Sequence, residues 1–127
     1  MTTYAHLNVE KRGHTALVTI SNPPANTWNS DSLAALVDLV TDLNADRDIY
    51  ALVLTGEGSK FFSAGADLKL FADGDKAMAR RMARLFGQAF EALTAFRGVS
   101  IAAINGFAMG GGLVVALACD LRIAEAQ

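Results

Sequence analysis

The sequence predicts an α/β fold in which short strands alternate with amphipathic helices. Two observations support this prediction. Compact apolar runs, at residues 51–54 and 99–104, stand between longer segments whose apolar residues recur at helical spacing. The connections between these runs are long enough for right-handed crossovers, so the strands are expected to lie parallel. With 127 residues, 52% of them hydrophobic, the chain can bury a core and is not a disordered protein.

The first elements are expected to be a hairpin and a helix. Residues 5–22 predict a hairpin with its turn at Gly13, because residues 16, 18 and 20 alternate with residues 17, 19 and 21. Pro23 and Pro24 then end the second strand, because proline has no N–H to donate to a ladder. The helix begins at Asn29 or Ser30, since either side chain can cap it. Its apolar face consists of Leu33, Leu36, Val37, Val40 and Leu43.

The second part of the chain repeats this alternation. Residues 52–54 predict a strand covered on both faces, because its centre is almost continuously apolar. Residues 59–71 predict a loop, and residues 75–96 predict a second amphipathic helix. The run Val99–Ile104 is expected to be a strand parallel and adjacent to residues 52–54. A further strand begins at residue 121 with no helix after it, so we expect a truncated part of a longer domain.

The stretch from Gly98 to Cys119 carries no charged residue and contains three consecutive glycines, Gly110–Gly112. It is long enough to span a bilayer, but each glycine inside a helix destabilises it by about 1 kcal/mol relative to alanine. Division into strand, turn and helix is therefore favoured over a membrane span. Sequence patterns of phosphate-binding loops are absent. The glycines either allow a helix to pack closely on a strand or expose N–H groups to a ligand oxygen.

A second glycine loop favours the ligand interpretation. The segment "FFSAGADLK", residues 61–69, also follows a strand and places Gly65 before a small residue, Ala66. Two backbone N–H groups from two strand ends could hold one carbonyl oxygen. Such a pair stabilises an enolate without any charged side chain.

Other features narrow the class of protein. The net charge of −2 gives no general attraction for nucleic acid. A single cysteine, Cys119, and an N-terminus without an apolar signal segment indicate a reducing compartment, the cytoplasm. No metal-ligand spacing links His6 and His14. Trp28 is expected to pack beneath the proline loop, and Asp67 to cap the turn that follows it.

Two segments, "FFSAGADLK" and "AAINGFAMGGGLVVALACDLRIAEA", closely resemble the crotonase family of enoyl-CoA hydratases and isomerases. The segment "NPPANTW", residues 22–28, resembles the loop after that family's first hairpin. The resemblance implies a crotonase-like spiral of ββα turns, with residues 1–127 as the N-terminal portion of a single domain. It implies an acyl-CoA thioester as substrate, with coenzyme A part of that substrate, no separate cofactor and no metal. It also implies a homotrimer or homohexamer for the full-length protein.

The resemblance also implies roles for individual residues. The N–H groups of Ala66 and Gly111 would form an oxyanion hole. Asp120 would have a structural role, and Lys69 would lie near phosphate charge of the coenzyme. The complete set of implied substrate-binding positions is Ala25, Ala64, Ala66, Asp67, Leu68, Lys69 and Gly111.

One position departs from the pattern of the hydratases. They carry a glutamate two residues after the third glycine, where this chain has Val114, and the family's second acid would lie beyond Gln127. The implied function is acyl-CoA binding and enolate stabilisation in an enoyl-CoA hydratase, which adds water syn to a trans-2-enoyl-CoA in fatty acid or related acyl-CoA catabolism. A Δ3-Δ2-enoyl-CoA isomerase and a non-catalytic acyl-CoA-binding fragment remain open.

Overall fold

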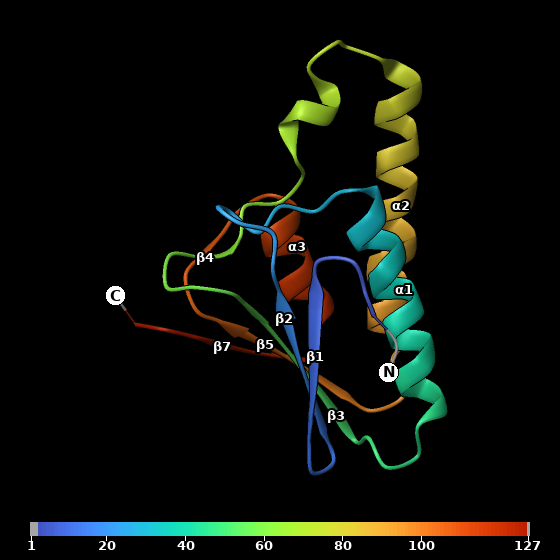
Figure 1. Ribbon diagram of the computed structural model, residues 1–127, viewed down its shortest axis with the longest axis vertical. Helices are drawn as coiled ribbons and strands as arrows, with labels where there is room; N and C mark the ends of the chain where they lie inside the picture. Colours follow the sequence, from blue (N-terminus) through green and yellow to red (C-terminus); the bar gives the residue numbers. More distant parts are fainter. Residues whose placement is uncertain (1–2, 127) are drawn as a thin grey trace.

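The computed structural model describes residues 3–126 and shows three successive ββα turns followed by one more strand (Figure 1). The first turn consists of β1 (Leu7–Arg12), β2 (Thr15–Ile20) and helix α1 (Ser30–Ala45). The second consists of β3 (Ala51–Gly56), β4 (Phe61–Ser63), the short 3-10 helix η1 (Leu68–Phe71) and α2 (Lys76–Thr94). The third consists of β5 (Val99–Ile104), β6 (Phe107–Ala108) and α3 (Gly111–Ala118), and β7 (Leu121–Ala124) follows. The predicted α/β fold of ββα turns is confirmed.

Five strands form one sheet, in the order β1-β2-β3-β5-β7. Only β1 and β2 pair antiparallel, and the remaining neighbours are parallel. Leu52 lies opposite Ser100, and Leu54 lies opposite Ala102. The prediction that residues 52–54 and 99–104 are parallel neighbours is therefore confirmed. The two remaining strands, β4 and β6, form a separate small parallel sheet.

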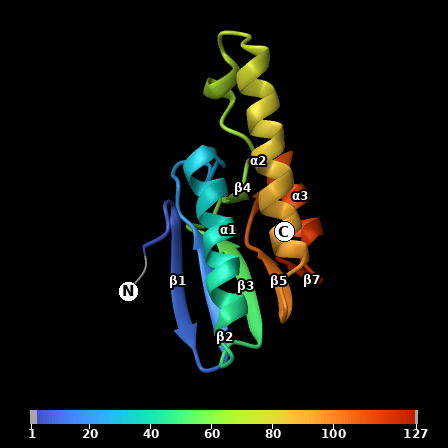
Figure 2. The same cartoon turned by 90° about the vertical axis from the view of Figure 1, so that its right-hand side faces the viewer.

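Helices α1 and α2 run side by side against the large sheet (Figure 2). Asn29 caps α1 as expected, and its side chain and that of Ser32 form a reciprocal capping box. Asp75 caps α2 by accepting hydrogen bonds from the N–H groups of Ala77 and Met78. The core between helices and sheet includes the fully buried Leu36 and Leu54.

The prediction that the central strands are covered on both faces is wrong for the described residues. In β3, Leu52 and Leu54 are fully buried, whereas Ala51, Val53 and Thr55 are only partly buried. In β5, Val99 is exposed while Ser100 and Ala102 are buried. The reason is that α1 and α2 cover one face of the sheet, so burial alternates along each strand.

The prediction of a plain loop at residues 59–71 is also wrong. Phe61 and Ser63 pair with Phe107 and Ala108 of β6, and residues 68–71 form η1. A strand this short is stabilised by its distant partner and not by a local pattern. Among residues 3–126 no helix has the length and apolar character needed to cross a membrane. The uncharged run instead divides into β5, β6 and α3.

Candidate functional site

The two glycine loops meet where β4 ends and α3 begins. Gly65 follows β4 with φ of +95°, in the left-handed region that favours glycine. A Cβ atom added there would lie 2.8 Å from the backbone nitrogen of Gly111 and 2.8 Å from the carbonyl oxygen of Met109. The loops therefore touch backbone to backbone, and no other residue type fits at position 65 without displacing Gly111.

The backbone around Ala66 is held on both sides, while its own N–H is left unused. Trp28 N–H donates to the carbonyl of Gly65 at 2.7 Å, and Asp67 N–H donates to the carbonyl of Trp28 at 3.1 Å. Within residues 3–126, the Ala66 N–H makes no hydrogen bond to another backbone group. It is thus a fixed donor that is available to a ligand.

The first turn of α3 leaves a second such donor. Gly112 N–H donates to the carbonyl of Met109 at 2.8 Å, and Val114 N–H donates to that of Gly110 at 3.1 Å. Gly111 N–H has no backbone acceptor in the part of the chain that the structure describes. An unpaired N–H at a helix start carries partial positive charge, which suits an oxygen that becomes negative.

Both donors belong to residues that line one pocket of about 470 Å³. Val114, half-exposed, lines the same pocket. Three residues of α2 complete the lining: Phe86, Gly87 and Phe90. None of these six residues has a polar side chain. The lining is therefore apolar, and two of its residues carry N–H groups without a backbone acceptor among residues 3–126, so the pocket suits a hydrocarbon chain.

A network of polar side chains fixes the loop that carries Ala66. Ser63 donates to the carbonyl of Asn26 at 2.8 Å and accepts from the N–H of Gly65 at 3.2 Å. The Asn26 amide in turn donates to the carbonyls of Glu57 and Phe61, at 3.0 and 3.1 Å. Asn26 and Ser63 are both buried. The sequence interpretation missed these two residues, and the only available signal was their position beside loops.

Asn105 performs a similar task where β5 ends. Its side chain accepts from the N–H of Gly56 at 3.0 Å and donates to the carbonyls of Gly56 and Gly58, both at 2.9 Å. These bonds tie the end of β3 to the segment that leads into β6. A polar residue directly after a predicted strand indicates that its side chain holds neighbouring backbone in place. The sequence does not show which backbone groups Asn105 binds, because they lie far away along the chain.

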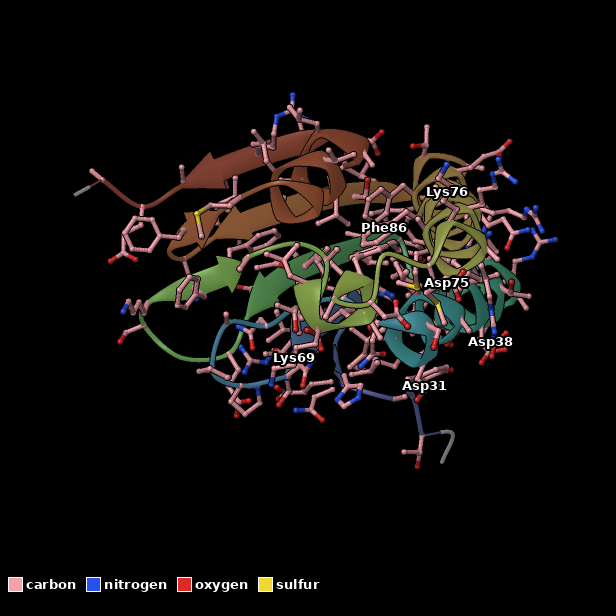
Figure 3. The ribbon with its side chains drawn as sticks, turned by 90° about the horizontal axis from the view of Figure 1, so that it is seen from above. Asp31, Asp38, Lys69, Asp75, Lys76 and Phe86 are labelled. Atoms are coloured by element: carbon pink, nitrogen blue, oxygen red, sulfur yellow. The ribbon has the colours of Figure 1, made fainter. Side chains whose placement is uncertain are left out.

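The remaining predicted substrate-binding residues do not line this pocket. The carbonyl of Ala25 accepts from the N–H of Ala64 at 2.9 Å, so these two positions are adjacent. Asp67 caps η1 by accepting from the N–H of Lys69 at 3.1 Å, which confirms the predicted cap. Leu68 and Lys69 are exposed. In Figure 3, Lys69 lies on η1, apart from Phe86, which lies between α2 and α3.

Three other residues have structural roles. Trp28 is fully buried and packs edge-on against Phe90, with ring centroids 6.3 Å apart. Asp120 accepts from the N–H of Ser100 at 2.9 Å, and its own N–H donates to the Ser100 hydroxyl at 2.9 Å. Cys119 is buried, and this burial raises the pKa of its thiol to about 11, so the thiolate is scarce at neutral pH.

Known proteins are similar to this chain in sequence and in fold. A sequence profile of the family described as enoyl-CoA hydratase/isomerase matches residues 10–127. The short-chain-enoyl-CoA hydratase of Clostridium acetobutylicum is 39% identical over 120 residues, which cover 94% of this chain and 46% of that protein. The crotonyl-CoA hydratase of Syntrophomonas wolfei is 38% identical over 125 residues, which cover 98% of this chain and 48% of that protein.

Solved structures agree with these sequence relatives. The structure of Pseudomonas aeruginosa DspI is 70% identical and superposes with a TM-score of 0.97, over 100% of this chain and 52% of that chain. An enoyl-CoA hydratase from Bacillus anthracis is 33% identical with a TM-score of 0.90, over 94% of this chain and 47% of that chain. The chain thus spans about half the length of the relatives it matches. From the profile match and these relatives, the chain belongs to the enoyl-CoA hydratase/isomerase family, the crotonases.

Proposed function

We propose that this chain forms the acyl-CoA-binding and enolate-stabilising part of an enoyl-CoA hydratase that works in the cytoplasm. The observation that carries the proposal is the pair of unbonded N–H groups, on Ala66 and Gly111, beside one apolar pocket. The names of two relatives, a short-chain-enoyl-CoA hydratase and a crotonyl-CoA hydratase, support the same substrate class.

In this proposal the thioester oxygen of a trans-2-enoyl-CoA accepts hydrogen bonds from Ala66 and Gly111. Its acyl chain enters the apolar pocket. The coenzyme follows the backbone of Ala25, Ala64 and residues 67–69, with the exposed Lys69 ammonium near its phosphates. Coenzyme A is part of the substrate, and the reaction requires no separate cofactor.

The chemistry adds water across the α,β double bond. A hydroxyl group joins the β-carbon, the electron pair of the double bond moves toward the thioester, and the negative charge on its oxygen is stabilised by the two N–H groups. The resulting enolate then takes a proton at the α-carbon. Each proton transfer needs an acid or base, and Val114 can supply neither.

None of the six pocket residues has a titratable side chain, so two alternatives to the hydratase stay part of the proposal. A Δ3-Δ2-enoyl-CoA isomerase loses an α-proton to form a dienolate, which the same two N–H groups could stabilise. It excludes water, and one carboxylate can move the proton from the α-carbon to the γ-carbon. A non-catalytic acyl-CoA-binding role would need no carboxylate at all. Either alternative keeps the two backbone donors in the same role. The homotrimer or homohexamer implied by the family resemblance belongs to the proposal for the whole protein.

The test compares butyryl-CoA with free coenzyme A in calorimetric titrations of the 127-residue chain. We expect butyryl-CoA to bind more tightly, because only it offers a carbonyl to the two donors. Ala66→Pro deletes one donor and should weaken butyryl-CoA binding about fivefold, the value of one net hydrogen bond. Ala66→Gly keeps the N–H and should retain most of the affinity.

The same variant has a larger expected effect in the whole protein. There Ala66→Pro should cost about 3 kcal/mol of transition-state stabilisation in the hydration of crotonyl-CoA. A folded Ala66→Pro variant with unchanged butyryl-CoA affinity and unchanged turnover would overturn the oxyanion assignment. Thermal unfolding of each variant checks that it is folded.

A further inference from the structure

Gly87 lies inside α2, where glycine is an unfavourable choice. Glycine in a helix interior destabilises the helix by roughly 1 kcal/mol relative to alanine. A Cβ atom added at Gly87 would meet no heavy atom within 4 Å. Its φ is also not in the left-handed region. Neither close packing nor backbone conformation therefore requires glycine at this position.

The position of Gly87 supplies another reason. With Phe86 and Phe90 it forms the part of the apolar pocket that α2 contributes, and Ala66 and Gly111 line the same pocket. Phe86 stands next to the N–H donors, because a Cβ on Gly111 would lie 2.9 Å from its ring atom Cε1. Gly87 is exposed, so it lies at the outer side of the pocket.

The rings of Phe86 and Phe90 are held in place by aromatic contacts and form an apolar surface on this side of the pocket. Phe86 and Phe90 pack edge to face, with ring centroids 5.4 Å apart, and Phe90 packs in the same way on the buried Trp28. Phe86 lies between α2 and α3 (Figure 3). A group that extends from the donors can thus follow the ring of Phe86 and pass out over Gly87.

We propose that Gly87 determines substrate specificity: the missing side chain keeps open a passage through which a straight apolar acyl chain longer than four carbons leaves the pocket, along the wall of Phe86 and Phe90. This inference rests on the proposed acyl-CoA function and names its substrate class. No pocket side chain can pair with a carboxylate or hydroxyl on the acyl group. Such polar acyl groups are disfavoured, because burying them unpaired is unfavourable.

The experiment titrates the 127-residue chain with saturated straight-chain acyl-CoAs of about four to ten carbons. In the native chain each added methylene should tighten binding about fourfold, as expected for burial in an apolar site. Gly87→Leu fills the passage. It should lower the ratio of the affinity for the longest acyl-CoA to the affinity for butyryl-CoA at least tenfold.

Two control variants separate the passage from other effects. Gly87→Ala raises helix propensity and adds little volume, so it should keep the preference for long chains. Ala83→Leu adds the same side chain at an exposed position one turn earlier on α2, outside the pocket lining, and should leave the whole series unchanged.

The outcomes separate this inference from the proposed function. Equal affinity for all chain lengths in the native chain, or the same length dependence in a folded Gly87→Leu variant, overturns the role of Gly87. In that case butyryl-CoA can still bind more tightly than coenzyme A and lose this advantage in Ala66→Pro, which leaves the proposed function intact. If no acyl-CoA binds more tightly than free coenzyme A, both the function and the inference are overturned.

Discussion

At the scale of single residues, the three consecutive glycines satisfy three different requirements. Gly110 has φ of +53° and open space where a side chain would stand. A Cβ on Gly111 would touch a phenylalanine ring in the pocket, whereas a Cβ on Gly112 would lie 2.0 Å from the carbonyl oxygen of Ser63. Of the two interpretations left open by the sequence, close packing applies to Gly112, and the ligand-facing backbone at Gly111 stays a prediction.

Gly112→Ala should be strongly destabilising. Its Cβ would overlap backbone atoms of β4, which cannot turn away as a side chain could, so α3 must move. We expect a loss of about 3 kcal/mol in the free energy of unfolding, measured by urea denaturation. Gly87→Ala makes the same chemical change in open space and should stabilise the chain by up to about 1 kcal/mol. Equal effects of the two substitutions would contradict the packing argument.

Val114→Glu tests the meaning of the valine in the pocket. Val114 is 50% exposed, so the substitution should change the free energy of unfolding by only about 0.5 kcal/mol. If the protein is a hydratase that lacks an acid, the new carboxylate should raise the rate of crotonyl-CoA hydration by about 10²–10⁴-fold. Hydration and the double-bond shift of a 3-enoyl-CoA are measured together on the whole protein.

The neutral variant Val114→Gln controls for shape and should gain nothing in hydration. Good isomerase activity that Val114→Glu does not improve would favour the isomerase. A high rate of crotonyl-CoA hydration in the native protein that Val114→Glu does not change would show that Val114 does not face the reacting carbons.

At the scale of elements, the C-terminus of α1 depends on a residue from another part of the chain. The last turn of α1 contains no basic residue. Arg97, which follows α2, instead donates to the carbonyls of Asn44, Asp46 and Ile49, at 3.2, 2.8 and 3.0 Å. One guanidinium thus joins the end of α1, the approach to β3 and the approach to β5, and its charge complements the helix dipole.

Arg97→Ala should therefore lower the free energy of unfolding by about 1–2 kcal/mol, because several carbonyls lose a charged donor. Arg97→Lys keeps the charge but cannot reach all three carbonyls, so it should recover only part of this loss. Arg80→Ala, an exposed change on α2, is the control and should have almost no effect. Urea denaturation measures all three, and an Arg97→Ala variant as stable as the native chain would refute this role.

The elements that the sequence predicted correctly are those with a strong local pattern. The hairpin, α1, α2 and the strand at 99–104 all have caps, turns or apolar periodicity within a few residues. The small sheet was missed because β4 and β6 are too short for any period, and they exist only through pairing across the chain. The glycine loops marked the candidate site, but the helical stripe of α2 showed only that Phe86 and Phe90 are apolar. The loops that contact Phe86 and Phe90 come from distant parts of the sequence, so no local pattern could identify them.

At the scale of the whole molecule, two consecutive elements of the described structure, α3 and β7, expose large apolar side chains. Leu113 and Leu117 on α3 are 46% and 57% exposed, and Leu121 and Ile123 on β7 are 56% and 67% exposed. In the sheet order, β7 has a neighbour only on the β5 side, so its other edge is unpaired among residues 3–126. Exposed apolar side chains next to an open strand edge promote association between chains.

The 127-residue chain should consequently associate as its concentration rises, since its net charge of −2 gives only weak repulsion. Sedimentation velocity over about a hundredfold range of concentration should show a shift from monomer to larger species. Leu117→Glu combined with Ile123→Lys places charges on α3 and on β7, and should return the chain to monomer at concentrations where the native chain associates. The matched control, Ala79→Glu with Ala83→Lys, adds the same charges on exposed positions of α2 and should leave association unchanged. Because neither apolar position lines the acyl pocket, the charged variant should also keep its affinity for butyryl-CoA. A native chain that stays monomeric throughout the range would show that these exposed apolar residues do not drive association.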